Sequence, residues 1–205
     1  MSWEDVSAAI AEAECPVAVL PADAAHAAEC LSGLGISDQS WLGAVVANTG
    51  GLLLDHGWLR VLGSGAPGLP DVLADADRQS AYLPVGHDVL GGQFVWTPND
   101  SGRPTIHYFG PDALEWRDLE LGYAEWLAAM LGGSLDGFYE TLRWPGWAEE
   151  VSACRPDQGI HTFPPPWSVQ GKDLATVSRK VIPMTELVSF HEDTARQLAS
   201  GSANT

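Results

Sequence analysis

The stretch from Leu83 to Trp147 constrains the fold more than any other part of this 205-residue chain, because its hydrophobic period changes partway along. In its first half, Phe94 and Trp96 lie two positions apart after a Gly-rich turn, which is typical of a strand with one aromatic face. The turn residues TPNDSGRP follow, and then a β-prone run at 106–109. This half predicts a β-hairpin or meander.

In the second half of the stretch the apolar spacing becomes helical. Between 123 and 131 the apolar residues recur at i, i+3, i+4, i+7 and i+8, which places them on one helical face. Gly132-Gly133 predicts the end of that helix, and Ser134 predicts the cap of a second helix. Strands followed by two helices with wide apolar faces predict an α+β fold, in which helices pack on a mostly antiparallel central sheet.

Turn and cap residues divide the rest of the chain into short elements. In the first half of the chain we expect a helix from Trp3, a helix from Pro21 to Gly33 or Gly35, and a hairpin over 52–62 with its turn at 55–57. A short acidic helix is expected after Pro70. Near the C-terminus we expect a strand over 178–183 and a helix over 185–198. The apolar run at 41–48, preceded by a capping Ser40, fits either a helix or a strand.

The length of the chain suits one domain with an extension. We expect a single α+β domain over 1–198, consisting of an N-terminal helical part (1–40), a core of sheet and helices (41–150) and a C-terminal extension (151–198). The polar residues 199–205 are expected to form a disordered tail.

The net charge of −17 restricts the partners that the chain can bind. With 10 Lys and Arg against 27 Asp and Glu, the protein repels phosphates, which disfavours binding to nucleic acid or to an anionic membrane. A basic protein partner is compatible with this charge. The acidic N-terminus does not resemble a signal peptide, no apolar run reaches membrane-spanning length, and the three unclustered cysteines are typical of reduced thiols. These features predict a cytoplasmic protein.

Two pairs of neighbouring residues, Asp55-His56 and His87-Asp88, each place a carboxylate beside an imidazole in an expected turn. If both turns lie at one edge of the sheet, the two pairs could converge on a small-ligand pocket or a metal. Adjacent residues do not face each other as a catalytic dyad must, however, and no G-x-S-x-G motif supplies an activated nucleophile. Hydrogen-bonded turn residues are the simpler interpretation.

Three further motifs resemble functional sites only weakly. GSGAPG, with Gly63, Gly65 and Gly68, matches the dinucleotide fingerprint in form, but no βαβ unit surrounds it, so an ordinary turn is expected. His26 and Cys30 lie at i and i+4 of an expected helix and could bind a metal, but no third or fourth ligand is apparent from the sequence, so a plain helix face is expected. Cys154 and His161 form a conceivable thiol-imidazole pair, which their spacing alone cannot support.

The second half of the chain combines acids with tryptophans. The acids are Glu115, Asp118, Glu120, Glu125, Glu140, Glu149 and Glu150, and the tryptophans among them are Trp116, Trp126, Trp144 and Trp147. Acids beside aromatic anchors are typical of a protein-binding face, although tryptophans of the core beside solvated acids would give the same pattern. Our candidate interaction or pocket residues are Asp55, His56, Trp58, His87, Asp88, Trp144 and Trp147.

Two strings, DHGWLR (55–60) and LRWPGW (142–147), resemble an uncharacterised bacterial family of unknown function over most of residues 15–190. More distantly, the Asn-x-Gly-Gly turn, the motif Gly-x-Asp-x-x-Gly-Gly-x-Phe (86–94) and the Tyr-x-x-Trp-Leu helix are similar to the SUKH superfamily. That resemblance implies an α+β fold with a mostly antiparallel sheet. It also implies function through protein binding, since the superfamily includes bacterial immunity proteins that neutralise toxins, and it implies no catalytic residues.

The resulting hypothesis is a non-enzymatic protein-interaction domain, of the immunity type, that binds a basic toxin or another basic partner and needs no cofactor or metal. The alternative is a small-ligand-binding or metal-binding protein, or an enzyme, with a pocket near His56, His87 and Asp88. A homo-oligomer held by an exposed aromatic edge strand is the third possibility.

Overall fold

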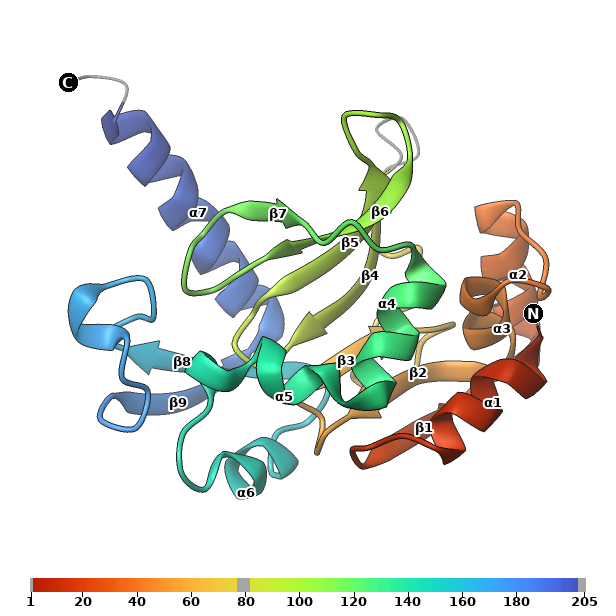
Figure 1. The fold of residues 1–205 in the computed structure, drawn as a ribbon, viewed down its shortest axis with the longest axis horizontal. Helices are drawn as coiled ribbons and strands as arrows, with labels where there is room; N and C mark the ends of the chain where they lie inside the picture. Colours follow the sequence, from red (N-terminus) through yellow and green to blue (C-terminus); the bar gives the residue numbers. More distant parts are fainter. Residues whose placement is uncertain (1, 77–81, 203–205) are drawn as a thin grey trace.

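The computed structural model describes residues 2–76 and 82–202 and shows an α+β fold. The large sheet is an antiparallel meander of seven strands, in which each strand pairs with the next one along the chain (Figure 1). Its strands are β1 (Val17–Pro21), β2 (Thr49–Leu54), β3 (Leu59–Leu62), β4 (Leu83–Asp88), β5 (Gln93–Pro98), β6 (Pro104–Phe109) and β7 (Trp116–Asp118). A separate two-stranded sheet pairs β8 (Gln158–Phe163) with β9 (Ser178–Pro183). The predicted fold class is therefore confirmed.

Helices cover both faces of the large sheet. The α-helices of the described residues are α1 (Trp3–Ala11), α2 (Ala24–Leu34), α3 (Trp41–Asn48), α4 (Tyr123–Ala129), α5 (Leu135–Phe138), α6 (Trp147–Ser152) and α7 (Met184–Ser202). Short 3-10 helices lie at Glu140–Leu142 and Val169–Gly171. Among the helices that the structure describes, none is both long and apolar enough to cross a membrane.

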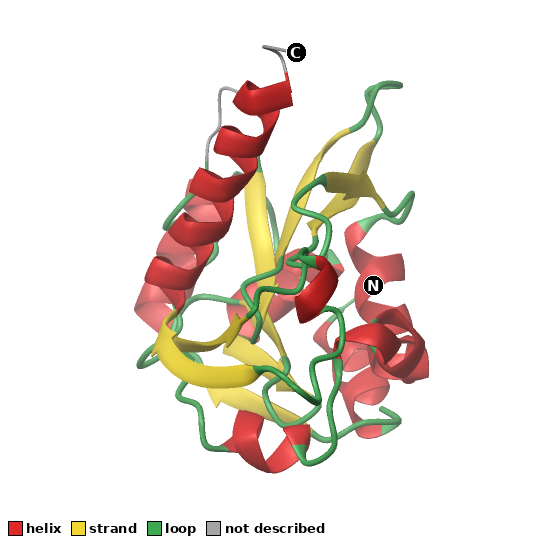
Figure 2. Cartoon of the chain, turned by 90° about the vertical axis from the view of Figure 1, so that its left-hand side faces the viewer, coloured by secondary structure: helices red, strands yellow, loops and turns green. Residues whose placement is uncertain are grey.

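Neighbouring residues of β5 show which helix lies on each face. Phe94 packs against Trp126 of α4, with ring centroids 5.2 Å apart, whereas the Gln93 amide reaches Glu192 of α7 at 3.2 Å. Successive residues of a strand point to opposite faces, so α4 and α7 lie on opposite sides of the sheet (Figure 2). The core is thus built from two helical layers with the sheet between them.

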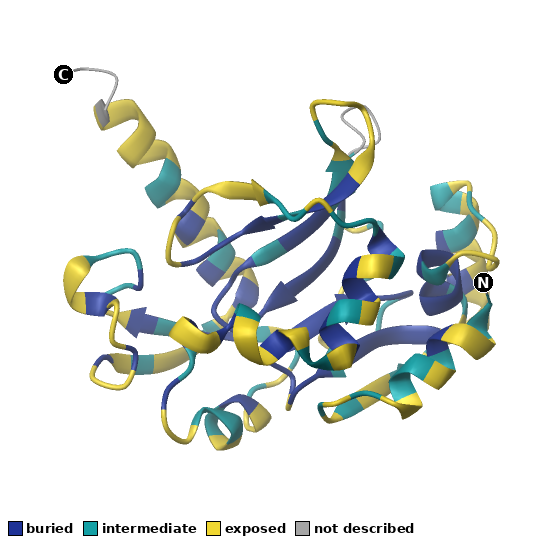
Figure 3. Ribbon diagram, viewed as in Figure 1, coloured by how far each residue is buried: buried dark blue, intermediate teal, exposed yellow. Residues whose placement is uncertain are grey.

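Helix α7 is attached to the body through its first half. Met184, Leu187 and His191 are buried at helical spacing, whereas the residues after them are mostly exposed (Figure 3). The helix continues to Ser202, so residues 199–202, which the sequence predicted as part of a disordered tail, are helical. The Ser200 hydroxyl donates to the Arg196 carbonyl within this last part, and residues 203–205 lie outside the described part of the chain.

Side-chain caps decide where several helices begin. The Asp23 carboxylate caps α2 by accepting from the His26 N–H at 2.9 Å, so α2 starts after Pro21, which instead ends β1. The Ser40 hydroxyl accepts from the Gly43 N–H at 3.0 Å. This cap resolves the ambiguity at 41–48, which is the helix α3.

Other elements differ from the sequence-based expectation. Residues 71–76 form turns rather than the start of an acidic helix, because the Asp71 side chain accepts from the Leu73 N–H at 2.7 Å; residues 77–81 of the expected segment lie outside the described residues. Ser134 makes no side-chain cap, and the chain passes from α4 to α5 through a kink at Gly132 and Gly133. Strand β7 was not predicted, since its three residues carry no apolar alternation.

Candidate functional site

The two turns that carry the Asp-His and His-Asp pairs do lie at one edge of the large sheet. Leu59 at the start of β3 pairs with Asp88 at the end of β4, and the Val89 N–H donates to the Trp58 carbonyl at 2.9 Å. The β2–β3 turn has a left-handed backbone, with φ of 52° at Asp55 and 61° at His56. Two consecutive non-glycine residues with left-handed backbone are uncommon, and this conformation is that of the tight type I′ turn of a β-hairpin.

The side chains of the two pairs nevertheless point in different directions. His87 and Asp88 are consecutive in β4 and therefore face opposite sides of the sheet. His56 is exposed at the tip of its turn and packs edge-on against Trp147, with ring centroids 5.8 Å apart. The structure thus places the four residues at one edge without bringing both histidines into one pocket.

The Asp88 carboxylate is fully buried and is the centre of a hydrogen-bond network. Its Oδ1 accepts from the N–H groups of Leu90 and Gly92, both at 2.9 Å. Its Oδ2 accepts from the hydroxyls of Tyr108 at 2.8 Å and Tyr139 at 3.2 Å. Burial raises the pKa of this carboxyl above its usual range, and the four hydrogen bonds oppose that shift. Asp88 therefore joins the β4–β5 turn to β6 and to the end of α5.

On the opposite face, His87 lies beside a buried arginine. The Arg60 guanidinium donates to the carbonyls of Gly57, Pro156 and Gln158. The bonds to Pro156 and Gln158 link the large sheet to the start of β8. Burial, together with the charge of Arg60, lowers the pKa of His87 to about 3, although a hydrogen bond with the Pro156 carbonyl opposes the shift. Burial also lowers the pKa of Arg60 to about 10. His87 is thus a neutral imidazole of the core at pH 7.

Acidification is expected to destabilise the fold through His87. Its pKa is lowered in the folded state, so the stability it contributes is present above the unfolded-state pKa of about 6.5 and is lost as the pH falls towards 3. Between pH 7 and pH 5 the loss of folding free energy through His87 amounts to about 2 kcal/mol. Urea unfolding at both pH values measures it: the His87→Gln variant should lose about 2 kcal/mol less than the wild type on acidification. The exposed His56→Gln variant is the matched control, and equal pH dependence in wild type and His87→Gln would contradict the expectation.

A stack of aromatic rings around one arginine forms the outer layer of the same sheet edge. The Arg143 guanidinium lies 4.2 Å from the ring centroid of Trp147 and 5.3 Å from that of Trp58. It forms ion pairs with Asp55 and Asp136. This stack fixes the segment between α5 and α6 on the β2–β3 turn.

The candidate tryptophans of this edge differ in exposure. Trp58 and Trp144 are buried, whereas Trp147 is half-buried and is the ring that His56 contacts. Arg143 was not among the residues predicted for this site. Its position next to Trp144 within the LRWPGW string was the available signal, because arginine stacks readily on aromatic rings.

The acids and tryptophans of the second half are not uniformly exposed. Trp126 is completely buried, whereas Trp116 on the edge strand β7 is 45% exposed. Of the acids, Glu150 binds Arg179 at 2.9 Å and Glu125 binds Arg103 at 3.2 Å. The pattern therefore contains both core tryptophans and partly exposed ones.

The dinucleotide-like GSGAPG segment is a turn pinned to the sheet. The N–H groups of Ser64 and Gly65 donate to the carbonyls of Thr49 and Gly50, both at 3.0 Å, so they do not point towards a phosphate position. Turns follow instead of a helix. This arrangement matches the expectation of an ordinary turn.

Cys154 and His161 have separate partners. The Cys154 thiol donates to the Glu150 carbonyl at 3.5 Å, and the His161 ring packs on Phe190 with centroids 5.3 Å apart. A thiol-imidazole pair is therefore not formed by these residues in this structure.

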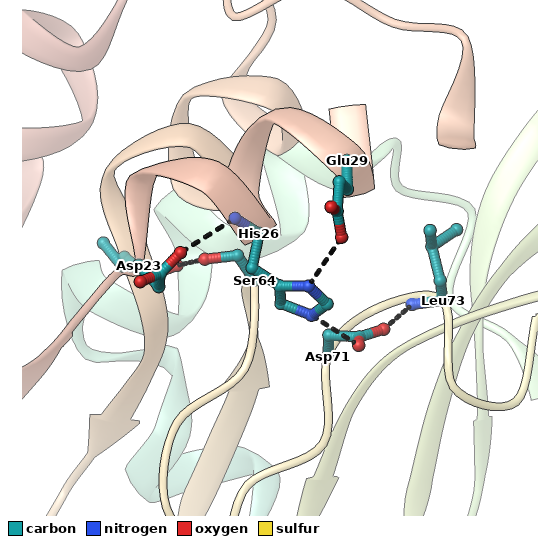
Figure 4. A network of polar contacts seen from close by, with 7 residues as sticks. Asp23, His26, Glu29, Ser64, Asp71 and Leu73 are labelled. Atoms are coloured by element: carbon teal, nitrogen blue, oxygen red, sulfur yellow. Dashed lines mark hydrogen bonds and ion pairs between the residues drawn. The ribbon is translucent and has the colours of Figure 1, made fainter. Parts of the chain in front are cut away.

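A third candidate, His26 with Cys30, gains a partner that the sequence did not indicate. The His26 Nε2 lies 2.9 Å from Asp71 Oδ2, and its Nδ1 lies 3.3 Å from Glu29 Oε2 (Figure 4). A ring nitrogen of His26, the sulfur of Cys30 and a carboxylate oxygen of Asp71 all lie within 4.8 Å of one another. Hydrogen bonds to Asp71 and Glu29 raise the pKa of His26, and burial raises the pKa of the Cys30 thiol.

A cavity of about 450 Å³ lies between the end of α2 and strands β4 to β6. Its lining is mainly apolar and includes Leu34, Leu42, Leu73 and Trp96. Leu73 is also the residue whose N–H binds the Asp71 carboxylate, so the cavity and the cluster share one loop. Its volume falls within the range of small-molecule sites.

Comparison with known proteins identifies relatives of the whole chain. Residues 1–187 match the family described as "Protein of unknown function DUF2625". The uncharacterised protein YbfG of Escherichia coli strain K12 is 37% identical over 193 residues, which cover 91% of this chain and 88% of YbfG. An uncharacterised protein of Haemophilus influenzae strain Rd is 33% identical over 175 residues, covering 80% of this chain and 76% of that protein. No solved structure shows significant similarity.

Proposed function

We propose that this chain, which belongs to the family of unknown function DUF2625, is a non-enzymatic protein-binding domain with a basic partner. The observation that carries the proposal is the distribution of charge. The described arginines that form ion pairs with carboxylates are Arg103, Arg143, Arg155, Arg179 and Arg196. Arg60 is buried. Few of the cations that the structure describes are therefore both exposed and unpaired, while 27 acids against 10 basic residues give the net charge of −17.

A surface of this kind attracts a basic protein over a long range. Clustered charge of one sign raises the rate of association with a partner of opposite charge and suppresses binding to acidic molecules. It supports a protein partner better than a nucleic acid, whose phosphates it would repel. The similarity of residues 86–94 to the SUKH superfamily supports the same interpretation, and on that basis we propose an immunity-type role in which the domain covers the nucleic-acid groove of a basic toxin.

We place the contact at a surface that we call the turn surface, formed by His56, Asp136, Trp147 and Glu149. His56, Asp136 and Glu149 are exposed and Trp147 is half-buried, so a histidine and two acids, one of which (Asp136) pairs with Arg143, adjoin an aromatic anchor. The stack of Arg143, Trp58 and Trp144 beneath it holds Trp147 in place. A rigid aromatic ring with a charged rim is the usual anatomy of a binding hot spot.

The test is a pull-down with the tagged protein from the cell in which it occurs, read by mass spectrometry at low and high salt. A basic protein should co-purify at low salt and be lost at high salt, because exposed charge pairs are screened. The Trp147→Ala and Glu149→Lys variants should each capture less of it.

Asp100→Lys is the matched control, because it changes the net charge as much as Glu149→Lys does. Asp100 is exposed in the β5–β6 loop, at the opposite end of the strands from the turn surface. Equal losses in Glu149→Lys and Asp100→Lys would remove the turn surface from the proposal, and the absence of any salt-sensitive basic partner would contradict the proposal itself.

Small-ligand binding is the second candidate function, and the apolar cavity beside α2 favours it. The alternative location near His56, His87 and Asp88 has its carboxylate and its imidazole buried in hydrogen-bond networks of the core. An apolar fluorescent probe should quench or shift the emission of Trp96, which lines the cavity, and the Leu34→Trp variant should block that change by filling the space.

A further inference from the structure

Three different ligand types meet where α2 faces the loop after β3. They are an imidazole nitrogen of His26, the thiol of Cys30 and a carboxylate oxygen of Asp71, all within 4.8 Å of one another. An ion bound tetrahedrally at zinc distances separates its ligand atoms by about 3.3–3.8 Å, so small side-chain movements bring these three into range. Imidazole, thiolate and carboxylate are the groups that bind zinc in proteins.

The fold itself brings these side chains together. His26 and Cys30 are one helical turn apart on α2, whose first turn is fixed by the Asp23 cap. Asp71 comes from a loop 45 positions beyond His26 in the chain. That loop is held by the hydrogen bonds of Ser64 and Gly65 to the sheet and by the Val72 N–H, which donates to the Gly63 carbonyl at 3.0 Å. The carboxylate is aimed at α2 because its other oxygen accepts from the Leu73 N–H.

We propose that His26, Cys30 and Asp71 form a binding site for one zinc ion or a transition-metal ion of similar ligand preference. Cys30 is 1% exposed, and its thiol is not part of a disulfide. Its sulfur lies within 4.8 Å of a ligand atom of His26 and of Asp71, so one metal ion between them could bind all three side chains. Metal binding gives the thiolate a partner, and the thiol proton is released to solvent.

Glu29 supplies the support that metal-binding histidines usually have. A histidine that binds a metal through one ring nitrogen normally donates its other N–H to a carboxylate or a carbonyl. Here Nε2 faces Asp71 and the ligand position, while Nδ1 lies 3.3 Å from Glu29. Glu29 is a positioning residue, since it orients the ring without reaching the ion.

Two of the three ligand residues reach solvent, and the third is buried. The side chains of His26 and Asp71 are 46% and 22% exposed, whereas Cys30 closes the inner side. Three protein ligands with an open outer side leave the fourth position of a tetrahedral ion to water or to a small ligand.

The experiment uses the untagged 205-residue chain, stripped with a chelator and then titrated with zinc chloride alone. Elemental analysis should find one zinc ion per chain, and the melting temperature should rise with zinc concentration. Cobalt(II) in place of zinc should give a thiolate-to-metal charge-transfer band that is absent in the Cys30→Ser variant. Asp71→Asn should weaken zinc binding, and Glu29→Gln should weaken it by about 10–100-fold while leaving the thiolate band in place.

Cys15→Ser and Cys154→Ser are the matched controls, because each removes one thiol elsewhere in the chain and should leave zinc binding unchanged. Melting curves without metal show whether each variant is folded, and Asp71→Asn keeps the test valid if Cys30→Ser is unstable. Less than one zinc ion per chain in the wild type, or full zinc binding in both Cys30→Ser and Asp71→Asn, would overturn the proposal.

Discussion

Replacing Trp126 by alanine is expected to lower the free energy of unfolding by about 3–5 kcal/mol. Trp126 is completely buried in α4, with its ring 5.2 Å from that of Phe94 and 5.7 Å from that of Tyr123. Its tip lies against Gly86, where an added Cβ would be 3.6 Å from Trp126 Cη2. The alanine variant therefore leaves a cavity between α4 and the sheet, which the packed neighbours can fill only in part.

Two further variants separate this effect from a general effect of losing tryptophan. Trp126→Phe keeps an aromatic ring and removes an indole N–H that has no hydrogen-bond partner among the described residues, so it should cost below about 1.5 kcal/mol. Trp116→Ala removes a ring that is 45% exposed and should cost less than Trp126→Ala. Urea unfolding measures all three. A loss below about 1 kcal/mol for Trp126→Ala would mean that the apolar face of α4 is not the buried one.

Strongly periodic segments could be predicted from the sequence, because their period reflects burial on one side. The hairpin β2–β3, the strands β5 and β6 and the helix α4 all follow from apolar spacing and turn residues. The run 41–48 could not be assigned in this way, since α3 is buried on most sides and its apolar residues show no single face. The close approach of Gly43 to the Ser37 carbonyl, where a Cβ would lie only 1.9 Å from the oxygen, is a tertiary constraint that sequence periodicity does not contain.

Candidate sites were harder to predict than elements, because they depend on contacts between distant segments. The sequence indicated that two turns could share a sheet edge, and strand register places them there. It could not show that His87 and Asp88 serve different faces of the core, nor that Asp71 reaches His26. The expected helix after Pro70 concealed Asp71, since only the observed turn at 71–73 directs its carboxylate towards α2.

The Asp88→Ala variant is expected to lose about 3–5 kcal/mol of stability, although it removes a residue whose own burial is unfavourable. The substitution deprives four donors of their acceptor at once: the N–H groups of Leu90 and Gly92 and the hydroxyls of Tyr108 and Tyr139. Each buried donor without a partner costs about 1–3 kcal/mol, and the relief of burying the carboxylate offsets part of the sum over the four donors.

Asp88→Asn distinguishes the loss of acceptors from the loss of charge. The amide oxygen can still accept from the two backbone N–H groups, and the amide N–H₂ can donate to the tyrosine hydroxyls, which accept as well as donate. We therefore expect Asp88→Asn to cost about 1–2 kcal/mol. Denaturant unfolding of both variants tests this ranking, and equal losses would show that the charge, rather than the number of acceptors, stabilises the turn.

A double-mutant cycle with Tyr139→Phe locates the coupling between the sheet edge and the end of α5. Tyr139 contributes one of the four hydrogen bonds and also packs on Trp58, with ring centroids 5.4 Å apart. If the hydrogen bond joins the two segments, the double variant should lose less stability than the sum of the losses in Asp88→Ala and Tyr139→Phe, by at least about 0.5 kcal/mol. The reason is that phenylalanine has no hydroxyl that could be left without an acceptor. Strict additivity would mean that Tyr139 acts through its ring alone.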